Sequence, residues 1–309
     1  MRVRTLAFVP LAMAAVFGTA AAAFPGPGAA DRPPSLPALT GPALSARYTA
    51  DARAVAAADR VAARDGDTQL VGALTALRSQ QVLFFDSRGQ GLAGVVFGNL
   101  ATARRVAIVV PGSDTTLSTF FSRGTASPGG AAAALADEAR ELRQGNHLTV
   151  IAWLGYAAPP TMSTGVLTSA DAQAGAQALR PLVTALAARG DQVALLCHSY
   201  GSVVCGLAAP GLPATDIAVI GSPGMDAASA AALGTRARVW AGRGSNDWIG
   251  SVPHARVFGI GFGADPMSAG FGARVFATGG GHSDYFRPGS VSLRNLAWIA
   301  LGDPAEVTR

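Results

Sequence analysis

Lysine is absent from this chain of 309 residues, which has only two cysteines and 7% aromatic residues. All 24 basic residues are therefore arginine, and with 19 acidic residues they give a formal net charge of +5. The arginines are scattered, without a dense basic run or interleaved aromatic residues, and this argues against a nucleic-acid partner. The cysteines and histidines do not follow a metal-ligand spacing, so we predict neither a metal nor an organic cofactor.

A long hydrophobic run is also missing, because the apolar stretch at residues 6–17 is shorter than the ~20 residues that span a bilayer. Arg2 and Arg4 precede this stretch, and three alanines at 21–23 offer a cleavage site. This order predicts a signal peptide at residues 1–23, a secreted or cell-envelope protein, and no stable membrane span after cleavage. The alternative is an uncleaved membrane anchor.

Residues 24–42 are rich in proline and predict an extended linker. The remaining chain is long enough for one large domain with a substantial core. Residues 43–79 predict an N-terminal helical extension of two helices, the second of which is capped by Asp67. Two runs at 82–85 and 92–97, separated by a glycine-rich turn, predict a hairpin.

Strands and helices then alternate along residues 80–309. The apolar runs predict strands at 106–110, 148–154, 193–196, 217–220, 239–241 and 275–277, and helices at 130–143, 169–189 and 291–301. This alternation predicts an α/β domain with a mostly parallel sheet that helices cover on both faces.

The run VALLCHSYGS at residues 193–202 predicts a nucleophile elbow, the sharp strand-to-helix turn that lifts one serine above a parallel sheet. The turn crowds the backbone on both sides of Ser199, and Gly201 and Ser202 are suitably small. Cys197 stands where the usual pattern has glycine. Ser199 is the predicted nucleophile, and the alternative is a buried serine in an ordinary turn.

A serine nucleophile needs a base, and His282 lies on a glycine-rich loop just past the last predicted strand, where it can reach back over the elbow. We therefore predict His282 as the base. His254 precedes that strand and is expected at the surface or the rim of a pocket. His198 is expected to point elsewhere on the turn.

Asp247 follows the strand at 239–241 and is the predicted acid that orients the imidazole of His282. The alternative role for Asp247 is a turn cap. Asp226, after the preceding strand, is the second candidate acid, whereas Asp284 is too close in sequence to orient His282 easily.

An oxyanion forms in acyl transfer and needs backbone N–H donors. We expect one from Tyr200, directly after the nucleophile, and one from Ser113, in the loop that follows the strand at 106–110. An ordinary glycine turn is the alternative interpretation of that loop. Three further segments, at 155–162, 248–250 and 258–262, are candidates to line an acyl pocket and are equally explained by packing.

Cys197 and Cys205 flank the elbow. An exported protein permits a disulfide if the two Cα atoms lie within about 7 Å. The alternative, two small buried thiols, is the one we slightly favour from the sequence.

Four motifs together resemble uncharacterised α/β-hydrolases common in high-GC actinobacteria, over about residues 80–302. They are VVPG at 109–112, CHSYGS at 197–202, GSPG at 221–224 and GHSDYF at 281–286. The cysteine before the elbow also matches that family. The resemblance implies an α/β-hydrolase fold and a Ser-Asp-His triad, but no substrate.

Taken together, the motifs predict a secreted serine hydrolase that cleaves a carboxylic ester, of a lipid or of another acyl compound, through an acyl-enzyme. The expected partner is thus a small-molecule or lipid ester. An acyltransferase with the same triad and a non-catalytic binding protein of the same fold are the alternatives. A peptidase has no specific support in the sequence.

Overall fold

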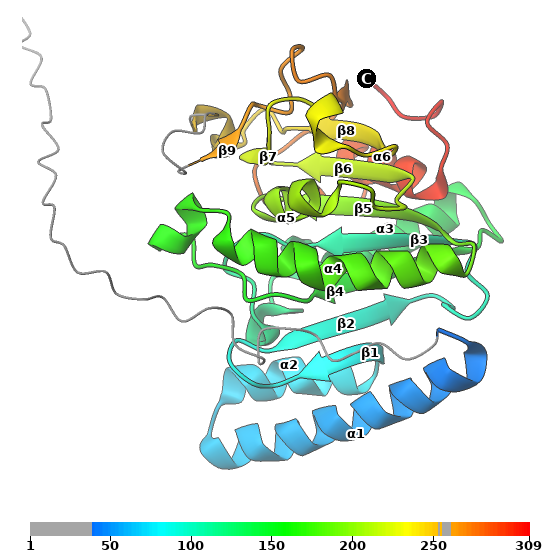
Figure 1. Cartoon of the computed structure of the whole chain (residues 1–309). Coiled ribbons are helices and arrows are strands. Elements are labelled where there is room, and N and C mark those ends of the chain that lie inside the picture. The colour runs from blue at the N-terminus through cyan, green and yellow to red at the C-terminus, as the bar shows by residue number, and fades with distance from the viewer. Residues whose placement is uncertain (1–38, 253, 255–260) are drawn as a thin grey trace, which may run out of the picture.

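A computed structural model describes residues 39–252, 254 and 261–309 of the chain (Figure 1). The predicted signal peptide and nearly all of the predicted linker lie outside these residues. The described chain has the predicted α/β architecture, in which one large sheet lies between layers of helices.

The main sheet has eight strands in the spatial order β1-β2-β4-β3-β5-β6-β8-β10. β1 and β2 form the predicted antiparallel hairpin, β2 is also antiparallel to β4, and all the other neighbours are parallel. The strands are β1 (Gln81–Asp86), β2 (Leu92–Phe97), β3 (Arg105–Val110), β4 (Leu148–Leu154), β5 (Gln192–His198), β6 (Asp216–Ile220), β8 (Arg238–Gly242) and β10 (Arg274–Val275).

The central strands are buried on both faces, which explains their continuous apolar sequences. Along β3, Ile108 and Val110 pack into one core, and Ala107 and Val109 pack into the other. Successive side chains point to opposite faces of a strand, so a single apolar run supplies both cores.

Helices cover both faces of the sheet (Figure 1). α4 and α5 pack on one face and α3 and α6 on the other, while α1 and α2 lie beside the β1 edge. Asp67 caps α2 as predicted, because its carboxylate accepts the Leu70 N–H at 2.9 Å. The helices are α1 (Gly41–Asp65), α2 (Thr68–Arg78), α3 (Pro128–Leu142), α4 (Ala170–Ala188), α5 (Gly201–Ala208) and α6 (Val291–Leu301).

Three details differ from the sequence-based expectations. α1 begins at Gly41, two residues inside the predicted linker. β10 ends at Val275 rather than at residue 277, although the Phe276 N–H still donates to Ala241 at 3.1 Å. A second, two-stranded parallel sheet of β7 (Gly224–Ala227) and β9 (Phe262–Gly263) was not predicted, because both strands are short and glycine-containing.

Five short 3₁₀ helices lie in the described loops, and the four that follow β3, β4 and β8 lie on the side of the carboxyl ends of those strands. The five are η2 (Leu117–Thr119), η3 (Gly124–Ala126), η4 (Thr164–Leu167), η5 (Ala231–Leu233) and η6 (Trp248–Ser251). Ligands of open α/β sheets bind at these strand ends, so this edge is where a site is expected.

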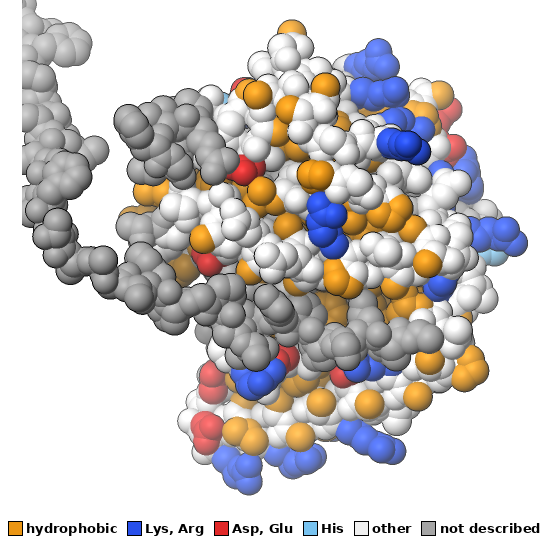
Figure 2. Space-filling view, in the orientation of Figure 1, with side chains coloured by type: hydrophobic (Ala, Val, Ile, Leu, Met, Phe, Trp, Pro, Cys, Tyr) orange, Lys and Arg blue, Asp and Glu red, His pale blue; other side chains and the backbone are white. Residues whose placement is uncertain are grey.

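On the face shown in Figure 2, arginine side chains are distributed around the surface rather than gathered in one patch. None of the helices in the described ranges combines the length and the apolar character needed to cross a bilayer.

Candidate active site

Ser199 sits on a strained turn between β5 and α5, with φ of +53°. This left-handed conformation is uncommon for a residue with a side chain and is the geometry expected of a nucleophile elbow. Gly201 must be glycine, because a Cβ there would lie 2.6 Å from the carbonyl oxygens of Val110 and Pro111. The turn predicted from the sequence therefore forms, and steric crowding explains why residue 201 is glycine.

Cys197 and Cys205 form a disulfide in the structure, with their Cα atoms 6.5 Å apart. The slight preference for two free thiols was wrong. The side chains of Cys197, at the end of β5, and Cys205, in α5, are buried in the same core. The cysteine that replaces the usual glycine thus joins the strand before Ser199 to the helix after it.

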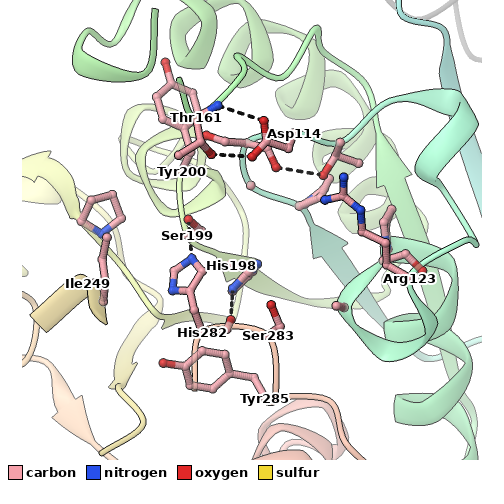
Figure 3. Close-up of a pocket in the computed structure, with 18 of the residues that line it drawn as sticks. Asp114, Arg123, Thr161, His198, Ser199, Tyr200, Ile249, His282, Ser283 and Tyr285 are labelled. Carbon is pink, nitrogen blue, oxygen red and sulfur yellow. Dashed lines mark hydrogen bonds between the residues drawn. The ribbon is translucent and has the colours of Figure 1, made fainter. Parts of the chain in front are cut away.

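Ser199, His282 and Asp247 lie in a hydrogen-bonded chain (Figure 3 shows the first two). The Ser199 Oγ and His282 Nε2 atoms are 2.9 Å apart, and His282 Nδ1 lies 2.9 Å and 3.1 Å from the two carboxylate oxygens of Asp247. A carboxylate only accepts, so Nδ1 carries the proton and Nε2 is left to accept the Ser199 hydroxyl. The three residues of the predicted triad are therefore brought together in the order that nucleophilic catalysis requires.

Asp247 is fully enclosed at the end of β8, and three donors share its carboxylate. These are His282 Nδ1–H, the Ile249 N–H at 2.9 Å and the Tyr285 hydroxyl, which itself accepts the Gly244 N–H at 3.0 Å. Burial alone would raise the pKa of Asp247, but the hydrogen bonds from His282, Tyr285 and Ile249 outweigh it and lower the pKa. The carboxylate is therefore held ionised beside His282.

Tyr285 was not among the predicted site residues. Its hydroxyl links the loop that carries His282 to the loop that carries Asp247. Its position three residues after His282 was the available signal, but a tyrosine followed by Phe286 resembles ordinary core packing.

His198 was expected to point away from the nucleophile, and the structure corrects this. Its Nε2–H donates to the backbone carbonyl of His282 at 2.8 Å, and the two rings have centroids 4.7 Å apart (Figure 3). Burial and the neighbouring His282 lower the pKa of His198 to about 4. His198 is thus a neutral donor that ties the His282 loop to the elbow.

The loop after β3 passes directly beside Ser199. A Cβ on Gly112 would lie 2.6 Å from the Ser199 Cβ, so only glycine permits this approach. Both residues predicted to supply oxyanion donors, Ser113 and Tyr200, line the same cavity as Ser199. Their N–H groups have no acceptor among the described residues and so are available to a ligand.

Asp114 fixes the shape of this loop. It adopts φ of +60°, and its own N–H is occupied by the Pro159 carbonyl at 3.2 Å. Its carboxylate accepts the Thr161 N–H at 2.9 Å and the Thr161 hydroxyl at 2.5 Å (Figure 3). These bonds join the loop after β3 to the loop after β4, and the Ser113 N–H is left without an acceptor among the described residues.

Ser199 and His282 open into a cavity of about 870 Å³. This volume is at the upper end of the usual range for small-molecule sites. Of the three segments predicted as candidates to line it, Thr161, Trp248, Ile249 and Phe262 do so, and residues 258–260 lie outside the described residues. Trp248 is 53% exposed at the mouth, and its ring centroid lies 4.8 Å from that of His282.

The other candidate residues do not join the chain of hydrogen bonds at Ser199. The Nε2 atom of His254 lies 3.3 Å from the Ser222 carbonyl oxygen and 3.8 Å from Oδ1 of Asp265. Asp284 accepts the Gly281 N–H and so shapes the His282 loop rather than orienting its ring. Throughout the ranges that the structure covers, no group of three His, Cys, Asp or Glu side chains is placed to share a metal ion.

Residues 86–257, more than half of the chain, match the family model described as alpha/beta hydrolase. The chain belongs to the alpha/beta hydrolase family. The match includes Ser199 and Asp247 and ends before His282. With the sheet order described above, it confirms the predicted fold class of this α/β-hydrolase.

Two relatives from Mycobacterium tuberculosis H37Rv agree with the predicted resemblance to uncharacterised α/β-hydrolases. Uncharacterized protein Rv2079 is 32% identical over 248 residues, which cover 69% of this chain and 37% of that protein. Uncharacterized protein Rv0963c is 33% identical over 179 residues, which cover 54% of this chain and 66% of that protein. The chain thus spans little more than a third of the length of the first of these relatives.

Among solved structures, a predicted CIB-like hydrolase from Thermoplasma acidophilum aligns with 15% identity and a TM-score of 0.45. The alignment covers 72% of this chain and 97% of that chain.

Proposed function

We propose that this α/β-hydrolase is a serine hydrolase that cleaves carboxylic esters through an acyl-enzyme. The observation that carries the proposal is the hydrogen-bonded chain from Ser199 through His282 to Asp247, at the floor of a large cavity. A serine at φ of +53° with an imidazole nitrogen 2.9 Å from its hydroxyl is an activated nucleophile rather than a packing residue.

In the acylation step, the Ser199 oxygen attacks the ester carbonyl carbon while His282 Nε2 takes the hydroxyl proton. Asp247 stabilises the imidazolium that forms and holds the ring in place. The N–H groups of Ser113 and Tyr200 are positioned to donate to the developing oxyanion. The carbon–oxygen bond to the alcohol then breaks, and the alcohol leaves with the proton from His282.

In the deacylation step, a water molecule gives its proton to His282 Nε2 and attacks the acyl carbon. The bond to the Ser199 oxygen breaks, the serine regains its proton from His282, and the carboxylic acid is released. All three residues act in both steps, so removing any one of them disables the whole cycle.

The cavity supports an acyl ester of a lipid or a similarly apolar compound as substrate. Val166, Leu167, Ile249 and Phe262 are among the residues that line it, and none of these side chains can hydrogen-bond a polar group. An apolar lining of this kind favours an acyl chain over a peptide or a free sugar.

The test is a panel of p-nitrophenyl esters of increasing acyl length, assayed with the wild type and with Ser199→Ala. We expect turnover by the wild type and a loss on the order of 10³-fold or more in the variant. Ester hydrolysis that survives in a correctly folded Ser199→Ala protein would overturn the proposal.

We also propose that the protein is exported. The signal-like order of residues 1–23 supports this, and the Cys197–Cys205 disulfide suits an oxidising compartment. Mass spectrometry of the protein recovered from the culture medium or the cell envelope should give a chain that starts near Phe24. A mature species that retains Met1 would contradict export by cleavage.

A further inference from the structure

The cavity above Ser199 has two walls of different chemistry. One wall comes from the segment after β3, where Ala126, Pro128 and Ala131 alternate with residues that carry hydroxyl groups or one positive charge: Thr115, Thr119, Arg123, Thr125 and Ser127. The other wall is apolar and comes from segments far apart in sequence, with Val166, Leu167, Trp248, Ile249, Val252 and Phe262. In Figure 3, Arg123 and Ile249 lie on opposite sides of Ser199. A ligand that fills the cavity therefore meets a polar surface on one side of the nucleophile and an apolar surface on the other.

Arg123 is the only lysine or arginine side chain among the described residues that line the cavity. No described carboxylate lies within ion-pair distance of its guanidinium, in contrast to Arg243, which pairs with Asp265 at 2.9 Å. The one carboxylate in the described lining belongs to Asp114, and the Thr161 N–H and hydroxyl already occupy it. The polar wall thus carries a guanidinium with no ion-pair partner among the described residues, and the Asp114 carboxylate, which keeps its charge when Thr161 donates to it, lies in the same lining without pairing with it.

The position of Arg123 is set by its own segment. The 3₁₀ turns η2 and η3 flank it, and its carbonyl accepts the Ala126 N–H at 3.1 Å. Figure 3 shows its side chain reaching from this segment toward Asp114, on the cavity side rather than away from the protein. Thr119 and Thr125, four residues before it and two after it, line the same wall.

We propose that Arg123, with the hydroxyl of Thr125, forms a subsite for an anionic group on the alcohol half of the ester, while the apolar wall takes the acyl chain. This inference rests on the proposed esterase function and names its substrate class, an acyl ester of a negatively charged alcohol. The guanidinium fork suits phosphate, sulfate and carboxylate oxygens, and the neighbouring Thr125 hydroxyl supplies a further donor. The acyl chain pairs with the opposite wall because only there does its burial avoid stranding polar groups.

The test compares naphthyl butanoate with its ring-sulfonated counterpart, which share the acyl group and differ only in a negative charge on the alcohol. The wild type should prefer the sulfonated ester in kcat/KM. Arg123→Gln should lower kcat/KM for the sulfonated ester by about five- to tenfold and leave the neutral ester within about twofold. Arg123→Lys should restore part of the preference, because it keeps the charge but not the planar fork.

Two controls separate the subsite from general surface charge. Arg236→Gln removes an exposed arginine that does not line the cavity and should leave both esters unchanged. Raising the salt to about 0.5 M should shrink the wild-type preference, since an exposed pairing is screened. Equal effects of Arg123→Gln on both esters, or an equal effect of Arg236→Gln, would overturn the proposal.

A third ester, the naphthyl hemisuccinate, carries its charge on the acyl half. If Arg123→Gln reduces turnover of this ester but not of the sulfonated one, the assignment of the polar wall to the alcohol is wrong. If only the subsite proposal fails, the wild type still hydrolyses neutral esters, and Ser199→Ala still abolishes this activity. Failure of the proposed function gives no turnover of any ester, and in that case fluorescence titration of Ser199→Ala with the sulfonated ester still tests the subsite. Binding that Arg123→Gln does not weaken would then overturn it.

Discussion

The floor and the walls of the cavity are built differently. The floor consists of strand ends and the turns that directly follow them, tied together by the Cys197–Cys205 disulfide and by hydrogen bonds from His198 and Tyr285. The walls consist of 3₁₀ turns and irregular loops, including the exposed side chains of Leu167 and Trp248.

This difference separates chemistry from selectivity. At the floor, the hydrogen bonds from Ser199 to His282 and from His282 to Asp247 are both 2.9 Å long. A small displacement of Ser199 or His282 would weaken them, so the floor must be rigid. At the walls, the side chains are apolar or carry a single charge, and under the proposed function a substitution there should change which ester binds without changing the reaction. Substitutions at the floor should therefore act on kcat and stability, and those at the walls on KM and substrate preference.

The largest effect is expected for the acid. Asp247→Asn should leave the protein folded but lower kcat about 10³- to 10⁴-fold, because an amide that donates to Nδ1 leaves His282 in the wrong tautomer. Asp226→Asn is the matched control, since Asp226 lies at φ of +55° outside the bond chain and asparagine tolerates that conformation. A small loss of kcat in Asp247→Asn together with a large loss in Asp226→Asn would show that Asp226, in β7, is the acid that orients His282.

The disulfide should matter for stability more than for chemistry. The double variant Cys197→Ala/Cys205→Ala removes a crosslink over a separation of eight residues and should lower the free energy of unfolding by about 2–3 kcal/mol. Denaturant unfolding under oxidising and reducing conditions measures this. A wild type that loses no stability on reduction would show that the elbow is held by packing alone.

His198 should make the floor sensitive to acid. Its pKa is about 4 in the folded protein against 6.5 ordinarily, so between these pH values the unfolded chain binds more protons. The free energy of unfolding should therefore fall, by about 2 kcal/mol for this partly exposed ring, as the pH drops from about 7 to about 4.

His198→Gln should flatten this pH dependence, because glutamine does not titrate. His147→Gln, at an exposed position outside the site, should keep the wild-type dependence. Parallel curves for the wild type and His198→Gln would show that other groups cause the acid sensitivity.

Tyr285→Phe should lower kcat about tenfold with KM unchanged, because Asp247 loses a charge-assisted hydrogen bond. The pKa of Asp247 should rise in this variant, because the hydrogen bond from Tyr285 is one of the interactions that lower it. Tyr48→Phe is the control, since the buried Tyr48 hydroxyl has no hydrogen-bond partner among the described residues. Equal kinetics for Tyr285→Phe and the wild type would reduce Tyr285 to a packing role.

The smallest effect is expected at the apolar wall. Trp248→Ala should raise KM about threefold for long acyl esters and less for acetate, because it removes apolar contact area at the mouth, and it should lower kcat less than Tyr285→Phe does. Val291→Ala, an exposed apolar residue outside the cavity lining, should change neither constant. If Trp248→Ala lowers kcat as much as Tyr285→Phe does, the walls and the floor do not have the separate roles described above.

The floor was largely predictable from the sequence because its signals are local. The glycine at 201, the apolar strand before Ser199 and the strand-end positions of Asp247 and His282 each follow from their immediate neighbours. Parallel strands bring their carboxyl ends to one edge, so residues far apart in the chain converge without further information.

The rest depends on distances that spacing does not fix. A separation of eight residues across a turn allows both a disulfide and two free thiols, and only the path of α5 decides. β7 and β9 pair across more than 30 residues with few apolar side chains. The orientation of His198 depends on where the His282 loop returns, and the wall chemistry depends on how four separate loops face one another.

The most direct test of the central claim, that Ser199 is the nucleophile activated by His282, is covalent labelling with a fluorophosphonate followed by peptide mass spectrometry. We expect one adduct per chain, on the peptide that contains Ser199, and strongly reduced labelling in His282→Ala but not in His254→Ala. An adduct on another residue, or active enzyme that hydrolyses esters yet takes up no probe at Ser199, would contradict it.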